Sequence, residues 1–157
     1  QPHKVDGNSM YPRLHNQEYL LTDKLSYNTG NPKRGDVIVF HAPPPSTSDY
    51  IKRIIAMPGE TVMLSNGRVY VNGQLLPEAY LPTGLYTTEK AFLRNNVPYQ
   101  VPPGYYMAFG DNRNFSSDSR EFGPVSRKSI VGKAFFRYWP VTVAGLIPHE
   151  NYSIKPL

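Results

Sequence analysis

Apolar residues recur along this chain in short runs, some alternating with polar residues and some compact, and turn residues bound each run. Alternation indicates a strand with one buried face, whereas a compact apolar run of about four to eight residues indicates a strand buried on both faces. The segments predicted to be strands are Tyr19 to Leu21, Val37 to Phe40, Ile51 to Ala56, Thr61 to Leu64, Arg68 to Val71, Tyr105 to Phe109 and Lys133 to Tyr138. The pattern therefore predicts a mainly β fold.

Turn signals separate the predicted strands. Asn66-Gly67 is the strongest hairpin signal, because Asn and Gly accept the positive φ that a tight hairpin turn requires. Helical periodicity is weak, and only Ser9 to Leu14 and Ser126 to Val131 are short helix candidates. The 16 Pro, 12 Gly and 12 Tyr residues also favour strands and turns over long helices.

The chain length fits one domain, since 157 residues lie close to the common domain size of about 100 to 150 residues. Between residues 74 and 103 the pattern loosens, with several Pro, Tyr and polar residues and no clean period. We therefore expect a single catalytic domain over residues 1–157 that contains a small irregular cap or insertion at 74–103.

Composition narrows the possible functions. The chain has no Cys, which excludes disulfides, thiolate metal sites and thiol catalysis. The formal net charge of +5 comes from scattered basic residues without a recognisable reading motif, so we expect no nucleic-acid partner. No stretch approaches the ~18 consecutive apolar residues of a membrane span. Because the chain opens at Gln1 without a leader, we expect that an upstream piece has been removed.

Hydrolysis by serine requires a base that takes the hydroxyl proton. The histidines are poor candidates, because neither a Gly-x-Ser-x-Gly elbow nor a paired-His zinc spacing accompanies them. A Ser-His-Asp triad is thus disfavoured, and we expect no metal and no cofactor. The histidines interpreted as surface residues are His3, His15, His41 and His149.

A lysine can serve as the base when burial disfavours its ammonium form and lowers its pKa. Lys52 is the best placed, since it lies between Tyr50-Ile51 and Ile54-Ile55 in a predicted apolar strand. The other lysines have more polar or terminal surroundings. On spacing alone, a solvated position on the outer face of the strand stays open.

Four motifs follow one another in a fixed order along the chain. They are Gly7 to Pro12 (GNSMYP), Arg34 to Phe40 (RGDVIVF), Asp49 to Glu60 (DYIKRIIAMPGE) and Gly110 to Arg113 (GDNR), the last continued by Ser116, Asp118, Ser119 and Arg120. In this order they resemble the conserved boxes of bacterial type I signal peptidases, which are serine proteases with a Ser/Lys dyad. Two positions depart from the family pattern: Arg13 stands where Thr is common, and Glu60 where Asp closes a Pro-Gly turn.

The resemblance implies a signal-peptidase-type fold of antiparallel β-sheets with little helix. It also implies that Ser9 is the nucleophile and that Lys52, in its neutral form, is the general base. Ser116 corresponds to the accessory hydroxyl that orients the lysine amine in this family.

Further residues match positions that support the site in the family. Gly7 stands where some members carry a hydroxyl that donates to the oxyanion, so a backbone group or water has to supply the second donor here. Arg53 with Asp111, and Arg120 with Asp118, match pairs that brace the site. Exposed surface pairs are the open alternative for these charges.

The resemblance further implies cleavage after signal peptides with small residues such as Ala at the last and third-last positions. The residues that match the pocket lining are Val5, Met10, Leu14, Tyr50 and Ile51. An extended substrate is expected to add as a strand between residues 5–7 and 49–51, two segments that include Asp6 and Asp49.

The expected partners are signal peptides of secretory preproteins and the membrane surface, with the catalytic domain on the extracytoplasmic side of the cell membrane. The sequence does not indicate an oligomeric state. Two alternatives stay open: a self-cleaving repressor-type Ser/Lys protease, and a non-catalytic β-domain that binds peptides or membranes.

Overall fold

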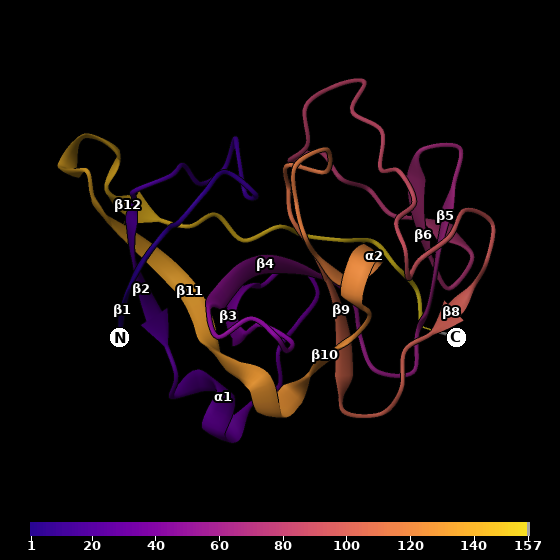
Figure 1. The fold of residues 1–157 in the computed structure, drawn as a ribbon, viewed down its shortest axis with the longest axis horizontal. Coiled ribbons are helices and arrows are strands. Elements are labelled where there is room, and N and C mark those ends of the chain that lie inside the picture. The colour runs from indigo at the N-terminus through magenta and orange to yellow at the C-terminus, as the bar shows by residue number, and fades with distance from the viewer. Residues whose placement is uncertain (157) are drawn as a thin grey trace.

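A computed structural model describes residues 1–156 as two antiparallel sheets joined by loops and short helices (Figure 1). The strands of the larger sheet, in spatial order, are β1 (Pro2–Lys4), β2 (Tyr19–Asp23), β11 (Ile130–Trp139), β3 (Val37–His41), β4 (Asp49–Ala56), β9 (Tyr105–Phe109) and β10 (Val125–Ser126), with β12 (Gly145–Leu146) paired to β11. Those of the smaller sheet are β7 (Gln74–Leu75), β6 (Arg68–Val71), β5 (Thr61–Ser65) and β8 (Tyr99–Gln100). The prediction of a mainly β fold is confirmed.

Each strand that the hydropathy pattern predicted is present, as β2, β3, β4, β5, β6, β9 and β11. The pattern did not reveal β1, β7, β8, β10 and β12. These strands are only 2 or 3 residues long. A period cannot be recognised over so few residues, and these strands form because a longer neighbour offers its edge.

The helical elements are α1 (Ser26–Thr29), α2 (Ser119–Phe122) and the short 3₁₀ helices η1 (Arg127–Ser129) and η2 (Val141–Val143). Of these elements, only η1 lies inside a predicted helix candidate, the one from Ser126 to Val131. The elements α1, α2 and η2 lie outside both candidates. The prediction of a helix from Ser9 to Leu14 is wrong, because this segment forms turns. One helix-like hydrogen bond is present there, from the Leu14 N–H to the Met10 carbonyl at 2.9 Å.

The segment 74–103 begins and ends in strands of the smaller sheet, since β7 pairs with β6 and β8 pairs with β5. Between them the chain runs as an irregular loop that buries Leu76 and Leu93 against the core of this sheet. The expected insertion is therefore irregular in its middle but is part of the smaller sheet at both ends. No helix within residues 1–156 has the length and apolar character needed to cross a bilayer.

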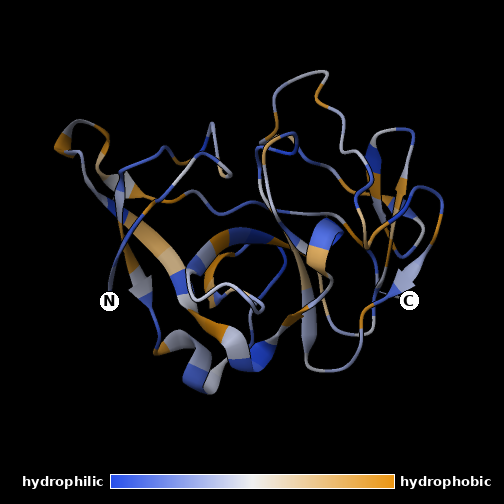
Figure 2. Cartoon of the chain, viewed as in Figure 1, coloured by the Kyte–Doolittle hydropathy of each residue, from blue (hydrophilic) through white to orange (hydrophobic). Residues whose placement is uncertain are grey.

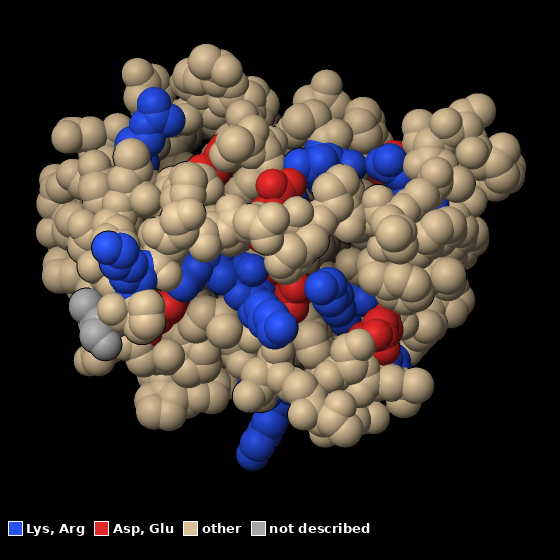
Figure 3. Space-filling model, turned by 180° about the vertical axis from the view of Figure 1, so that it is seen from behind, with Lys and Arg blue, Asp and Glu red and all other residues tan. Residues whose placement is uncertain are grey.

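Three groups of buried side chains stabilise the fold, and hydrophobic residues recur along the strands while most connecting loops are hydrophilic (Figure 2). On the face opposite to the view of Figure 1, Lys and Arg side chains are interspersed with Asp and Glu (Figure 3). The charges on that face are thus mixed in sign, which suits a soluble surface better than a polyanion-binding one.

Strand β4 has a central position that matters for the site. It pairs with β3 from Asp49 to Arg53, but with β9 only from Arg53 onward. The side chains from Lys52 to Ala56 are all buried. Consequently the second half of β4 is buried and paired with β9, whereas residues 49–52 are paired with β3 alone and have one unpaired backbone edge.

Two Asn-Gly turns in the smaller sheet allow a matched stability test. Gly67 and Gly73 have φ values of 72° and 73°, in the left-handed region that favours glycine. A Cβ at Gly67 would overlap the Tyr86 ring, whereas a Cβ at Gly73 would meet no atom within 4 Å. Urea unfolding should show that Gly73→Ala costs about 1 kcal/mol, from the backbone alone. Gly67→Ala should cost about 1–3 kcal/mol more, and equal losses would contradict the structure at this turn.

Candidate active site

The nucleophile and base predicted from the sequence lie side by side. Lys52 projects from the middle of β4, and its Nζ donates to Ser9 Oγ at 2.8 Å and to the Ile51 carbonyl at 3.1 Å. The two residues are 43 positions apart in sequence, so the fold alone joins them. The contact is close enough for direct proton transfer.

Lys52 is buried, with a relative exposure of 4%. Loss of hydration disfavours its ammonium form and lowers the pKa to about 8 from 10.5, although the carboxylates of Asp118 and Asp111 partly oppose the change. The Tyr50 ring lies 5.0 Å from Nζ and covers one side of the amine. A lysine in this environment is partly neutral near neutral pH, which a solvated outer-face lysine would not be.

The backbone of the nucleophile is held by the Gly110 to Arg113 motif. The Asn112 N–H donates to the Ser9 carbonyl at 2.9 Å, and Asn112 Nδ2 donates to the Asn8 carbonyl at 3.0 Å. Gly110 has to be glycine, because a Cβ there would lie 2.6 Å from the Ser9 carbonyl oxygen. The N–H of Ser9 itself donates no hydrogen bond within residues 1–156, so it is available to an oxyanion.

Gly7 precedes the nucleophile with a φ of 84°, a conformation that a residue with a side chain rarely adopts. Its N–H donates to Asn16 Oδ1 at 2.9 Å. This hydrogen bond ties the turn before Ser9 to the segment after it. Because its N–H is already used, Gly7 contributes conformation here, and the second oxyanion donor stays unassigned.

Arg53 and Asp111 form a buried two-pronged ion pair beside the dyad. Arg53 Nε and Nη2 donate to the two carboxylate oxygens of Asp111 at 2.9 and 2.7 Å. The exposed fractions of the two side chains are 0% and 1%. Nη1 of Arg53 donates to the Gly35 carbonyl at 3.1 Å, and the guanidinium stacks on the Tyr80 ring at 4.3 Å. The pair is therefore an internal part of the structure, and the alternative of a surface pair does not apply.

The second predicted pair is also internal. Arg120 Nε and Nη2 donate to Asp118 at 3.0 and 2.8 Å, and neither side chain is exposed. Asp118 also accepts from the Gly110 N–H at 3.0 Å. Burial alone would raise the pKa of Asp118, but the bonds from Arg120 and Gly110 outweigh it and hold the pKa below its usual range. The carboxylate stays charged and fixes the loop that holds Ser9.

The geometry around Ser116 differs from the expectation. Its Oγ is buried without a hydrogen-bond partner within the described chain, and the Lys52 amine bonds to Ser9 and Ile51 instead. The Ser116 carbonyl accepts from Lys90 Nζ at 2.6 Å, which holds the backbone of this turn. The orienting role of Ser116 therefore stays a prediction without a hydrogen bond to support it.

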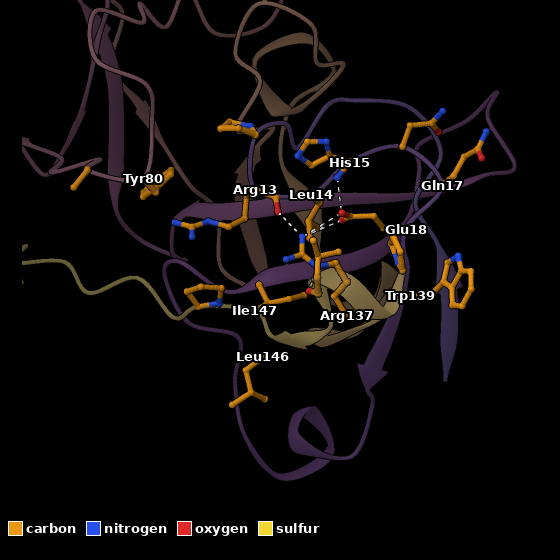
Figure 4. A pocket seen from close by; sticks show the side chains of 16 residues that line it. Arg13, Leu14, His15, Gln17, Glu18, Tyr80, Arg137, Trp139, Leu146 and Ile147 are labelled. Carbon is orange, nitrogen blue, oxygen red and sulfur yellow. Dashed lines mark hydrogen bonds and ion pairs between the residues drawn. The ribbon is translucent and has the colours of Figure 1, made fainter.

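A cavity of about 230 Å³ opens beside the dyad. Its lining includes Ser9, Lys52 and six of the predicted substrate-binding residues, namely Val5, Asp6, Met10, Asp49, Tyr50 and Ile51. Leu14 does not line it and instead packs in the core and borders a second cavity of about 870 Å³ (Figure 4). The structure thus places six of the seven predicted substrate-binding residues at the dyad, with Leu14 as the exception.

The family model for signal peptidase, peptidase S26, matches residues 1–139. The chain belongs to the signal peptidase family, peptidase S26. Signal peptidase I of Bacillus caldolyticus is 42% identical over 147 residues, which cover 87% of this chain and 78% of the relative. Signal peptidase IB of Staphylococcus aureus is 37% identical over 150 residues, covering 88% and 78%.

A solved structure agrees with this assignment. The crystal structure of a signal peptidase I from Enterococcus faecalis V583 has a TM-score of 0.53 and 31% identity, and the match covers 66% of this chain and 97% of that chain. As a signal peptidase, the chain is an enzyme that hydrolyses peptide bonds and removes signal peptides. This assignment decides between the hypotheses left open by the sequence, against the self-cleaving repressor and the non-catalytic β-domain.

Sequence reasoning missed several residues of this signal peptidase site. Lys4 and Ser117 line the dyad cavity, and Arg113 forms a third buried arginine pair with Glu78. Asn112 lies in the Gly110 to Arg113 motif, but the motif itself does not indicate what Asn112 contacts. Its two hydrogen bonds join residues more than 100 positions apart, and no local pattern signals such a contact. Within residues 1–156, no three or more His, Asp or Glu side chains gather into a group that could hold a metal ion.

The lowered pKa of Lys52 predicts an unusual pH dependence of stability. Below pH 8 the folded protein has to bury an ammonium that the unfolded chain hydrates, and this cost disappears as the pH rises from about 8 to 10.5. Lys52→Met keeps the volume without the charge. It should raise the free energy of unfolding at pH 7 by about 1–3 kcal/mol, with less gain at pH 10. Urea titrations at both pH values measure this, and a loss of stability at pH 7 would contradict the buried-amine description.

Proposed function

We propose that this signal peptidase cleaves preproteins with Ser9 as nucleophile and the neutral amine of Lys52 as general base. The observation that carries the proposal is the 2.8 Å hydrogen bond between a buried lysine amine and the serine hydroxyl. Within the described chain, no other lysine amine forms a hydrogen bond with a serine hydroxyl. Since burial lowers the pKa of Lys52 to about 8, the base form is accessible near neutral pH.

The chemistry follows from these positions. Ser9 Oγ attacks the scissile carbonyl while Lys52 Nζ takes the hydroxyl proton, and the N–H of Ser9 donates to the oxyanion. The resulting ammonium gives its proton to the departing amine, which leaves an acyl-enzyme on Ser9. Lys52 then deprotonates a water molecule that attacks the ester, and the proton returns to Ser9 Oγ as the acid leaves.

Two buried pairs support the dyad in this proposal. Asp111 neutralises Arg53, the residue next to Lys52, and Asp118 neutralises Arg120 and binds the Gly110 N–H. Each pair satisfies its own charges, so β4 and the Gly110 loop are held by pairs that leave no charge of their own unpaired.

The substrate is an extended peptide that binds in the cavity beside Ser9. Residues 49–52 of β4 have an unpaired edge, and such an edge accepts an added strand through backbone hydrogen bonds. A lining that includes Val5, Met10 and Ile51 in about 230 Å³ suits small apolar side chains. Preference for Ala at the last and third-last positions before the cut belongs to the proposal.

The dyad predicts both mutant activities and a pH profile. Ser9→Ala and Lys52→Ala should each lower kcat for an Ala-x-Ala peptide by at least about a thousandfold, because the two groups act as a unit. In the wild type, kcat/KM should rise with pH, and the midpoint of this rise should lie at about pH 8, since only the neutral amine accepts the proton.

The histidines are the controls for this profile, because an unperturbed imidazole titrates at about pH 6.5. His15→Asn and His41→Asn should leave the midpoint in place. Ser116→Ala tests the remaining orienting hypothesis by a shift of the same midpoint. If a histidine variant abolishes the acid limb, or if Lys52→Ala retains activity at neutral pH, the Ser/Lys assignment is lost.

A membrane surface is the second partner in this proposal, with the enzyme on the extracytoplasmic side. The turn between β11 and β12, with the strand ends beside it, supports this contact. Trp139 at the end of β11, Val141 in η2 and Leu146 in β12 are 52%, 70% and 75% exposed. Figure 2 shows hydrophobic residues at the tip of this turn. Exposed apolar groups gathered at one end of a protein favour contact with lipid.

Vesicle binding tests the membrane contact. The double variant Val141→Ser, Leu146→Ser should bind phosphatidylglycerol vesicles several-fold more weakly in a sedimentation assay, since burial of apolar area stabilises the contact. Leu75→Ser removes a leucine that is 54% exposed on β7 in the smaller sheet and should leave binding unchanged. Equal losses in both variants would show that this turn is not the contact.

A further inference from the structure

The end of the described chain crosses the molecule. After β12 it runs from the larger sheet to the smaller one, seen as the yellow trace that ends near β8 (Figure 1). We call residues 149–155 the C-terminal strap. At its far end, Gln74 Nε2 donates to the Lys155 carbonyl at 2.9 Å and the Lys155 N–H donates to Gln74 Oε1 at 3.1 Å, while Ile154 packs on the core of the smaller sheet.

The middle of the strap lies on the backbone beside the Arg53–Asp111 pair. A Cβ at Gly35 would lie 2.6 Å from the Tyr152 ring and 3.1 Å from the Glu150 carbonyl oxygen, so glycine permits this contact. The Gly35 carbonyl accepts from Arg53. The Tyr152 ring also meets Tyr80 at 6.1 Å between centroids, and Tyr80 in turn stacks on Arg53. The strap is thus fixed at two places that do not involve Ser9.

The start of the strap reaches the segment that carries the nucleophile. Glu150 Oε1 accepts from Arg13 Nη2 at 2.5 Å, and the side chains are 19% and 28% exposed. The backbone of Arg13 is held separately, because its carbonyl accepts from Arg137 Nη1 at 3.2 Å, a bond drawn in Figure 4. Arg137 also pairs with Glu18 at 3.2 Å. Residues 13–18 are therefore clamped between β11 and the strap.

The Glu150–Arg13 pair links a residue inside the matched family region to one beyond it. The family model ends at residue 139, before the strap begins. On the other side of the contact, Arg13 is one of the two positions where this chain departs from the family pattern. The pair joins two residues 137 positions apart, and this long-range link calls for an explanation.

Catalysis supplies a reason, because the Ser9–Lys52 contact is short and Ser9 lies on a turn. A displacement of about 1 Å of a reacting group is enough to lower a rate strongly. We propose that the C-terminal strap positions the nucleophile segment through the Glu150–Arg13 ion pair, which keeps Ser9 within reach of Lys52. Glu150 and Arg13 are positioning residues. This inference rests on the proposed function of the dyad.

The test is steady-state kinetics on an Ala-x-Ala peptide with the full chain. Glu150→Ala and Arg13→Ala should each lower kcat about three- to tenfold with KM within about twofold, a loss on the scale of a single positioning contact. The double variant should lose no more than either single one. The charge exchange Arg13→Glu with Glu150→Arg should recover at least half of the lost activity. Glu150→Gln keeps an acceptor and the size of the side chain, and it should lose less than Glu150→Ala.

A matched control and a stability measurement separate positioning from general damage. Arg94→Ala removes the exposed Arg94–Glu89 pair, whose side chains are 58% and 35% exposed, and should leave kcat unchanged. Thermal melts establish that each variant is folded, and all assays are run below the lowest melting temperature. Unchanged kcat in Glu150→Ala and Glu150→Gln, additive losses, or no recovery on charge exchange would each overturn the proposal. Ser9→Ala in the same assay tests the proposed function separately. If Ser9→Ala is active, the dyad assignment is wrong; if it is inactive and the Glu150 variants are unaffected, only the role of the strap is wrong.

Discussion

The structure depends on the burial of one amine. Lys52 is placed in β4 where the strand changes from half-open to fully covered, so its stem is surrounded by protein while its Nζ still reaches Ser9. Placing an ammonium there is unfavourable, and that same penalty makes the neutral amine accessible. The enzyme therefore gives up folding stability at the position where it needs a base, and the surrounding elements have to be stable enough to hold it.

Three buried arginines fix the elements around this amine. Arg53, Arg113 and Arg120 have no exposed surface, and each has a carboxylate partner, in Asp111, Glu78 and Asp118. Two of them also face the Phe109 ring from β9. Such pairs contribute little net stability over an apolar core, but their directional bonds fix one arrangement of the loops. Around Ser9 a single arrangement is what a 2.8 Å contact requires.

Sequence and structure agree best where information is local or carried by a motif. The long strands follow from hydropathy, and the motifs named Ser9 and Lys52 before any geometry was known. Leu14 shows where this reasoning fails, since a residue that matches a pocket position can turn into the core when its segment forms turns. The links Asn112 to Ser9, Glu78 to Arg113 and Glu150 to Arg13 join distant residues through single hydrogen bonds or ion pairs. Sequence periodicity does not indicate such contacts, and they are seen only in the folded structure.

The unpaired edge of β4 has a consequence beyond substrate binding. Backbone groups that accept an extended peptide will also accept the edge strand of another molecule, which is the usual beginning of sheet-to-sheet aggregation. The features around residues 49–52 oppose this. Asp49 carries a charge at the start of the edge, and the loop before it contains the proline run Pro43, Pro44 and Pro45, which cannot donate to a ladder. The unpaired edge that accepts a peptide and the residues that oppose pairing with another molecule thus lie next to each other, in one strand and the loop before it.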